Sequence, residues 1–311
     1  MSTNITSAVS SQVIIMAIFI AVGYLFTKIK MFSQDGTKEM TNLLLYIVTP
    51  CVIIKSFQRG YSSDSLEKLA VAFIVAIAVH VVMFVSSKLF YLKSKDKNRS
   101  IVDRFCISYS NCGFMGIPLL EAALGAEGVF VGSAYLAVFN VFVWTQGYKM
   151  FTAGTSKTSV LKVILNPGVI GVALSAILVF SGITLPKVAT TAIEGMSALN
   201  TPVAMVLLGI YLAETKILDA LKNFNLYIVC ILRLLVMPIA VVFALKALNI
   251  DISVSYATIL SAACPCATIS AIFAARFDKN SGYASSVVAV STLFSLVSLP
   301  FIAYVTSAIF A

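Results

Sequence analysis

Long apolar runs constrain this chain more than any other feature of its sequence. Ten stretches of about 20 mainly apolar residues follow one another, the length that an α-helix needs to cross a bilayer core. They cover residues 11–28, 40–57, 69–91, 104–120, 128–149, 161–181, 192–213, 226–248, 254–275 and 284–304. Only 11% of the 311 residues are charged, whereas soluble domains carry about 25%. The sequence therefore predicts an all-α polytopic membrane protein and excludes a soluble domain.

Lysine and arginine residues predict how these helices are oriented. Short cytoplasmic loops retain Lys and Arg, and placing both termini outside puts most of the 22 Lys and Arg residues inside. The net charge is +9, and the basic residues lie at the ends of apolar runs. A nucleic-acid-binding protein would instead carry a face of basic residues interleaved with polar ones. We expect a multi-pass protein of the plasma (cell) membrane, with the N-terminus and C-terminus outside and no nucleic-acid partner.

The two halves of the chain share a weak internal repeat. Thr49-Pro50 in the second run recurs as Thr201-Pro202 in the seventh, and residues 110–113 correspond in position to residues 262–265. Five runs per half is an odd number, so the second half must enter the membrane with the opposite orientation. The sequence predicts two inverted five-helix repeats, at 1–150 and 161–311, joined by a cytoplasmic linker at 151–160. Inverted repeats are typical of secondary transporters.

Prolines inside the apolar runs mark candidate discontinuities. Pro50, Pro202 and Pro265 lie well inside their runs, and Pro118 lies towards the end of the fourth. Each removes an amide donor and frees a carbonyl upstream. For a single proline, a lipid-adapted kink is the alternative interpretation.

Polar and small residues gather at one depth of the fourth and ninth runs. The polar ones are Ser108, Ser110, Asn111, Ser261, Thr268 and Ser270. A buried polar group needs a partner, and a substrate cavity would provide one for Asn111. Gly113 and Gly116 add flexibility and allow close approach in the fourth run. We therefore expect both runs to be broken helices at a central site.

Six cysteines all fall inside apolar runs, which is typical of small buried side chains rather than of a disulfide framework. Cys264-Pro265-Cys266 has no further Cys or His neighbour to complete a metal shell. We expect neither a metal nor another cofactor.

Ionisable side chains inside membrane helices are candidates for function. Arg233 lies inside the eighth run and Glu194 near the outer end of the seventh, so an ion pair between them is one expectation. His80 is the single histidine and could carry a proton. A neutral histidine packed between helices is the alternative that we favour, because nothing else in that run forms a relay.

Residues 111–120, Asn-Cys-Gly-Phe-Met-Gly-Ile-Pro-Leu-Leu, resemble the auxin efflux carrier family, which includes plant auxin exporters and bacterial permeases for malate and related organic acids. The resemblance extends along the whole chain. Its other points are residues 46–50, Asn166-Pro167, Arg233, Pro238, residues 263–265 and residues 291–300.

The resemblance implies ten helices in two inverted repeats, with helices four and nine broken and crossing at the centre. It implies the fold type of the sodium/bile-acid symporters and sodium/proton antiporters, and an elevator-like exchange. The residues that would hold the substrate carboxylate are Asn111, Gly113, Thr49, Pro50, Cys264, Pro265, Cys266, Asn166 and Asn200, with Pro118, Pro202 and Gly116 as hinges. Plant exporters use charged third-helix residues at a support site, whereas residues 71–87 here offer only His80. An auxin-like acid is therefore less expected than malate or a related acid.

Two other protein classes fit this sequence less well than a carrier. One histidine cannot form a His-Glu-x-x-His zinc motif, and no apolar run holds paired aspartates, so the sequence argues against an enzyme. A channel would need a pore-lining polar stripe or filter around an axis. A channel, or an ion-coupled antiporter for a cation or neutral solute, stays as the alternative. We expect a secondary transporter with a small organic anion and bilayer lipid as partners and H⁺ or Na⁺ as coupling ion; a homodimer is left open.

Overall fold

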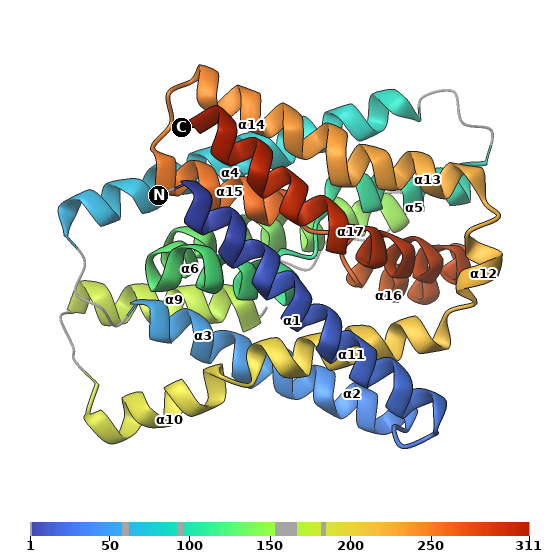
Figure 1. Cartoon of the computed structure of the whole chain (residues 1–311), viewed down its shortest axis with the longest axis horizontal. Helices are drawn as coiled ribbons and strands as arrows, with labels where there is room; N and C mark the ends of the chain where they lie inside the picture. Colours follow the sequence, from blue (N-terminus) through green and yellow to red (C-terminus); the bar gives the residue numbers. More distant parts are fainter. Residues whose placement is uncertain (1, 58–61, 92–95, 153–166, 182–184, 311) are drawn as a thin grey trace.

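The computed structural model describes residues 2–57, 62–91, 96–152, 167–181 and 185–310, and the statements below concern these residues (Figure 1). Within them the chain is helical. The helices are α1 (Ser2–Lys28), α2 (Gln34–Leu43), α3 (Thr49–Phe57), α4 (Ser63–Phe90), α5 (Lys97–Ser108), α6 (Ile117–Phe142), α7 (Tyr148–Phe151), α9 (Pro167–Ser181), α10 (Lys187–Ser197), α11 (Asn200–Glu214), α12 (Ile217–Ala220), α13 (Phe224–Ile231), α14 (Met237–Ala247), α15 (Ile252–Ala263), α16 (Ile269–Arg276) and α17 (Ser281–Phe310).

Seven helical segments of the described chain are long and apolar enough to cross a membrane. They are Ile5–Lys28, Gln34–Ser56, Ser63–Phe90, Cys112–Phe151, Lys187–Glu214, Phe224–Ala247 and Ser281–Phe310, and Ile252–Ala263 is a shorter apolar helix. The prediction of an all-helical, multi-pass membrane protein is confirmed. The count of ten spans and the division into two inverted halves stay predictions.

Helix α4 illustrates why such segments need lipid around them. Ile74 and Leu89 are 69% and 62% exposed, while Ala76 and Met83 on the same helix are buried. A helix that is apolar on its buried and exposed sides alike is stable only where its outer side meets hydrocarbon. The exposed side of α4 is therefore a lipid-facing surface.

The segment Cys112–Phe151 has 40 residues, which is too long for one crossing, and it bends at Gly125. Gly125 has φ 65° and ψ −154°, a conformation that is open almost only to glycine. Three residues later, a Cβ atom on Gly128 would lie 2.3 Å from Leu124 Cβ, so the two arms of α6 pack directly against each other. The bend lies between the fourth and fifth apolar runs, which the sequence analysis places at residues 104–120 and 128–149.

Prolines act on this fold by widening helical turns. Three π-helical turns end two residues before a proline: Leu44–Val48 before Pro50, Cys112–Gly116 before Pro118, and Leu232–Val236 before Pro238. Proline has no amide hydrogen and its ring clashes with the carbonyl four residues earlier, so the preceding turn adopts the wider i→i+5 pattern. Pro202 lies in the first turn of α11, where an amide hydrogen is not needed. Pro50 and Pro118 thus do not interrupt their helices, contrary to expectation, whereas the seventh run is divided between α10 and α11 at residues 198–199, just before the turn that holds Pro202.

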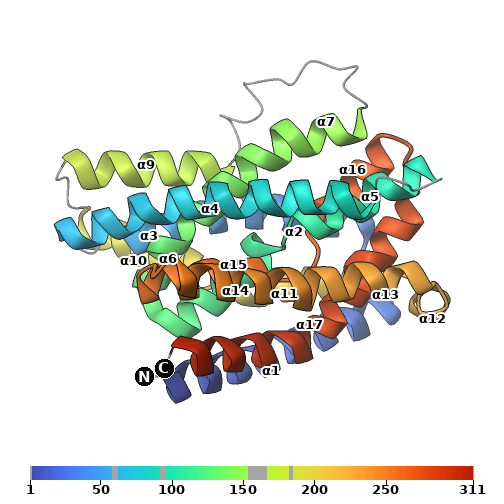
Figure 2. The same ribbon diagram turned by 90° about the horizontal axis from the view of Figure 1, so that it is seen from above.

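Both ends of the described chain lie side by side at one end of the molecule, as Figure 1 and Figure 2 show. The hydroxyl oxygens of Thr6 and Ser307 are 3.0 Å apart there. Helix α12 lies at the opposite end in both views. Helix α1 runs between the two ends and crosses α11 so closely that a Cβ on Gly209 would lie 2.1 Å from the Ile20 carbonyl oxygen. Such contacts between small residues are how membrane helices gain close packing.

Two helices of the described chain are interrupted near the middle of the molecule. Helix α5 ends at Ser108 and helical structure resumes at Cys112, while α15 ends at Ala263 and α16 begins at Ile269. We call residues 109–111 the first break and residues 264–268 the second break. They lie in the fourth and ninth apolar runs, where the sequence predicts broken helices.

Candidate functional site

The two breaks pair with each other like two short antiparallel strands. The Asn111 amide donates to the Pro265 carbonyl over 2.8 Å, and the Ala267 amide donates to the Tyr109 carbonyl over 3.0 Å. Backbone groups that leave a helix inside a membrane need protein partners, because lipid offers none. Each break supplies partners for the other, so the interrupted helices cross at this point.

Local sequence explains the second break. Pro265 cannot continue a helix and disfavours a helical residue before it, and Cys264 accordingly has φ −58° and ψ 151°. Cys266, the residue after Pro265, is fully buried, and its amide donates to the hydroxyl oxygen of Ser291 on α17 over 3.2 Å. Helix α17 therefore anchors the second break from outside the crossing.

A cavity of about 170 Å³ lies beside the crossing, and we call it the crossover pocket. It is lined by Thr41, Leu45, Tyr46, Thr49, Asn111, Gly113, Phe114, Leu136, Phe139, Asn140, Trp144, Tyr211, Ala267, Thr268, Ile269 and Ile272. Since a water molecule takes up about 30 Å³ in the liquid, the pocket has roughly the volume of six waters. Largely apolar walls with a few convergent polar groups are typical of small-molecule sites.

Two asparagine side chains bring amide groups to this pocket. Asn111 is 5% exposed, and its Nδ2 donates to the Thr268 hydroxyl oxygen over 3.3 Å. Asn140 is also buried, and its Nδ2 donates to the Leu136 carbonyl over 2.9 Å. An amide nitrogen carries two hydrogens and the amide oxygen accepts. Each asparagine therefore keeps hydrogen-bonding capacity for a solute.

Two helix N-termini also face the crossover pocket. Asn111 precedes the π-helical turn Cys112–Gly116 that leads into α6, and Thr268 directly precedes α16. The first amides of a helix have no acceptor within that helix, and each N-terminus carries about half a positive charge. The pocket wall formed by Gly113, Phe114 and Ile269 is thus built from first-turn residues, an arrangement that favours anions.

Arg233 lies at the same crossing and is fully buried. Its Nε donates to the Cys264 carbonyl over 3.1 Å, its Nη1 to the Ile107 carbonyl over 2.9 Å, and its Nη2 to the Ala262 carbonyl. The expected ion pair with Glu194 is wrong, because Glu194 is exposed on α10 and the guanidinium is occupied by backbone carbonyls. Those carbonyls belong to the last turns of α5 and α15, where no amide of the same helix is available to them.

His80 is almost fully buried and does not line the crossover pocket. Its Nδ1 lies 2.8 Å from the Ala76 carbonyl, and its ring contacts those of Tyr135 and Phe142, with centroids 4.6 and 5.4 Å away. This environment fits the packed histidine that we favoured. Proton transfer by His80 stays a prediction.

The structure brings some of the other candidate residues to the pocket and leaves others outside it. Thr49 and Gly113 line the pocket together with Asn111. Pro50 instead faces α9, where a Cβ on Gly171 would lie 3.1 Å from Pro50 Cα. Asn200 is buried at the start of α11, and neither polar atom of its side chain has a partner. Its amide does not line the pocket.

The cysteines of the second break are packing residues in this geometry. Cys264 and Cys266 are fully buried and neither lines the pocket. The Cys264 thiol donates to the Leu260 carbonyl over 3.3 Å, and a Cβ on Gly116 would lie 3.6 Å from its sulfur. Gly116 thus allows the two interrupted helices to approach. Asn166 lies outside the described residues.

Sequence reasoning missed several pocket residues. Asn140 carried a usable signal, because an amide inside an apolar run needs a buried partner. Thr41 and Tyr211 carried none. Their hydroxyl oxygens lie 3.0 Å apart on helices that are distant in sequence, and only the fold brings them together.

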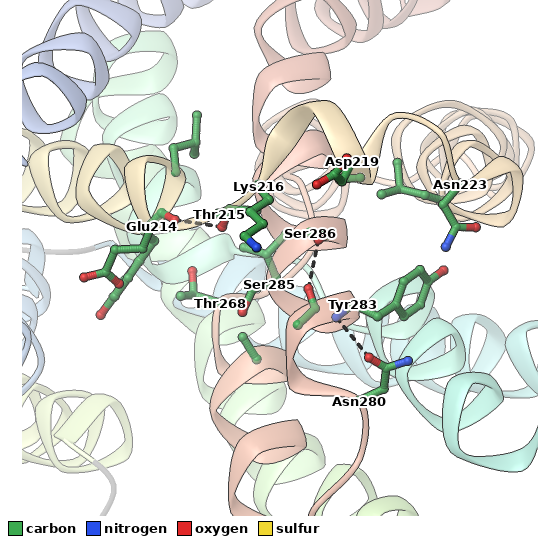
Figure 3. A pocket seen from close by; sticks show the side chains of 18 of the residues that line it. Glu214, Thr215, Lys216, Asp219, Asn223, Thr268, Asn280, Tyr283, Ser285 and Ser286 are labelled. Atoms are coloured by element: carbon green, nitrogen blue, oxygen red, sulfur yellow. Dashed lines mark hydrogen bonds between the residues drawn. The ribbon is translucent and has the colours of Figure 1, made fainter. Parts of the chain in front are cut away.

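Two larger cavities adjoin the crossover pocket. One has a volume of about 710 Å³ and shares Tyr211, Thr268 and Ile272 with it (Figure 3). The other has about 640 Å³ and shares Thr41, Tyr211 and Ile272 with it. Figure 3 shows acidic, basic and hydroxyl side chains of the first cavity around Thr268. At its rim, a hydrogen bond from Lys222, 3.0 Å away, lowers the pKa of Asp219, so this carboxylate stays ionised.

Comparison with known proteins agrees with these features. The profile of the membrane transport protein family matches residues 8–161 and 151–303. An uncharacterized transporter of Methanothermobacter thermautotrophicus is 22% identical over 94% of this chain and 96% of its own length. An uncharacterized transporter of Methanocaldococcus jannaschii is 23% identical, over 91% and 94%. The chain therefore belongs to the membrane transport protein family, which is the auxin efflux carrier family that its motifs resemble.

Proposed function

We propose that this protein is a secondary transporter that moves a small organic anion across the plasma membrane, with its substrate site in the crossover pocket. One observation carries the proposal. The pocket lies where two helix N-termini meet beside the Asn111 amide. Free first-turn amides and the helix dipoles together stabilise a carboxylate without a lysine or arginine at the site.

Malate or a related small acid is favoured over an auxin-like acid. A compact acid with a few carbons suits a pocket of about 170 Å³. Residues 71–87 offer only His80 for the support site that plant exporters build from charged third-helix residues. Burying the carboxylate is expensive, so we expect Asn111, Thr268 and the first-turn amides to bind it together.

The adjoining cavities support alternating access. Their lining includes Arg99, Lys216 and Arg276, which belong to loops and helix ends that the Lys and Arg distribution assigns to the cytoplasm. We propose that this conformation is open to the cytoplasm, with both termini outside. Two inverted five-helix repeats and an elevator movement of the crossing would expose the same pocket to the other side.

Counterflow in proteoliposomes tests the proposed function. Vesicles loaded with unlabelled L-malate should accumulate labelled L-malate transiently against its gradient, and the flux should saturate with concentration. Single-channel current steps without counterflow would support the channel alternative. Counterflow of cations or neutral solutes but of no carboxylate would support the antiporter alternative.

The proposed orientation has its own test. Single cysteines replace the exposed Glu127 or Lys216 in a variant that lacks the six native cysteines. A membrane-impermeant thiol reagent added outside intact cells should label the cysteine at position 127 and not the one at position 216. Labelling of position 216 alone would reverse the orientation.

A further inference from the structure

Arg233 is a buried cation without an anionic side chain as partner in the described chain. It lies in the π-helical turn Leu232–Val236, is 0% exposed, and donates to the carbonyls of Ile107, Ala262 and Cys264. None of the ion pairs among the described residues includes it. An unpaired charge inside a membrane protein is expensive, which makes it a candidate for function.

The acceptors of this guanidinium are helix C-terminal carbonyls. Ile107 lies in the last turn of α5, and Ala262 and Cys264 lie at the end of α15. A helix C-terminus carries about half a negative charge. Two such ends together therefore offset about one positive charge, which is the charge of Arg233.

The other two helix ends at the crossing have the opposite polarity. The N-termini that follow the first break and the second break each carry about half a positive charge, and both face the crossover pocket. Without Arg233, the four helix ends would cancel and the pocket would have little net potential. With Arg233 on the two negative ends, about one positive charge is left for the pocket.

We infer that Arg233 is a positioning residue that sets the charge selectivity of the crossover pocket, because it neutralises the C-terminal ends of the two interrupted helices. It does not line the pocket and acts on a solute through the helix ends. The pocket then favours an anion over a neutral or cationic solute of similar shape. This inference rests on the proposed function only for the identity of the solute.

The inference is tested with a reporter that needs no substrate. A single cysteine at Phe114, in a variant without the native cysteines, reacts with a negatively charged sulfonatoethyl and a positively charged trimethylammonioethyl methanethiosulfonate. Phe114 lines the pocket in the first turn after the first break, and its replacement makes room for the reagent. The ratio of the two rates reports the local potential, whereas a change in packing alone would alter both rates together.

Four variants separate charge from packing. Arg233→Met removes the charge, and Arg233→Lys keeps it. Met83→Glu leaves Arg233 in place but puts a carboxylate beside it, since the Met83 sulfur lies 3.5 Å from Arg233 Nη1; Met83→Gln is the neutral control. If Arg233→Met does not fold, the Met83 pair decides the question.

We expect the anion-to-cation rate ratio to fall at least about tenfold in Arg233→Met and in Met83→Glu, on the scale of one unit charge at intermediate dielectric. The ratio should stay close to that of the parent in Arg233→Lys and Met83→Gln. An unchanged ratio in folded Met83→Glu would overturn the inference. If the ratio falls but no carboxylate binds the parent protein, the role of Arg233 stands and the proposed substrate class is wrong.

Discussion

The two sides of the helix crossing differ in what binds the helix ends. On one side, which we call the filled side, the C-terminal carbonyls of α5 and α15 accept hydrogen bonds from the guanidinium of Arg233. On the other side, which we call the open side, the N-termini after the two breaks border a cavity, with Asn111 and Thr268 at its wall. The negative ends receive a cation from the chain itself, whereas no Asp or Glu of the described residues lines the pocket at the positive ends.

The difference separates residues that stabilise the fold from residues that bind a ligand. Mutations on the filled side should lower the stability of the fold, because the buried carbonyls there have no other donors. Mutations on the open side should lower substrate affinity and change stability little. The following variants test this division.

Removing the charge of the filled side should have the largest effect. Arg233→Met leaves buried carbonyls without donors, and deletion of one partner of a buried charged contact costs about 3–5 kcal/mol. Thermal unfolding in detergent should therefore shift to a clearly lower temperature. Arg233→Lys should recover part of the shift, and an unchanged midpoint in Arg233→Met would show that the filled side does not hold the crossing together.

Removing the amide of the open side should mainly affect binding. A hydrogen bond to a charged group is worth about 1.5–3 kcal/mol, so Asn111→Ala should weaken substrate binding about tenfold or more. Labelled L-malate uptake into proteoliposomes measures this effect, with Asn140→Ala as a comparison within the same pocket. Normal uptake by inserted Asn111→Ala would remove Asn111 from the site.

The contact between the interrupted helices should tolerate one added methyl group and no more. At Gly116 a Cβ would meet Cys112 Cβ at 3.4 Å and the Cys264 sulfur at 3.6 Å, which is ordinary contact. Gly116→Ala should unfold near the parent temperature, whereas Gly116→Val should lose about 1–3 kcal/mol through overpacking. Equal unfolding temperatures for the two variants would show that the helices are not in close contact there.

The smallest effect is expected from loss of the Tyr211 hydroxyl, which lies where the crossover pocket meets its neighbouring cavities. The Tyr211 hydroxyl lies 3.0 Å from that of Thr41, and Tyr211 lines all three cavities. Tyr211→Phe removes one neutral hydrogen bond worth about 1 kcal/mol, so transport rates should change only a few-fold. Thr41→Val should have the same effect, and the double variant should add little. Strictly additive losses would indicate that the two hydroxyls act separately.

Sequence alone predicted the features that depend on local chemistry. Apolar length predicted membrane helices, and Pro265 predicted the second break. Proline was a poor guide elsewhere, because Pro50 and Pro118 follow wide helical turns that absorb the missing hydrogen bond. Whether proline breaks a helix depends on whether the freed carbonyls find other partners.

The side-chain contacts of the site depend on tertiary structure and were harder to predict. Sequence reasoning identified Arg233 as a candidate but predicted the wrong partner for it. Its acceptors are backbone carbonyls at helix ends, and every residue type carries a backbone carbonyl, so the sequence gives no signal for them. Tyr211 reaches the pocket from a helix whose sequence gives no signal for it. Asn111 was identified because a buried amide in an apolar run needs a partner wherever the helix packs.

The most direct test of the central claim is thermal stabilisation of the purified protein by mono- and dicarboxylates, including malate, malonate and indole-3-acetate. A ligand that binds the folded state raises its stability by mass action. We predict that a small carboxylate raises the unfolding temperature of the parent protein, and that the same concentration raises that of Asn111→Ala much less. An equal rise in Asn111→Ala, or no rise with any carboxylate, would contradict an organic-anion site at the crossing.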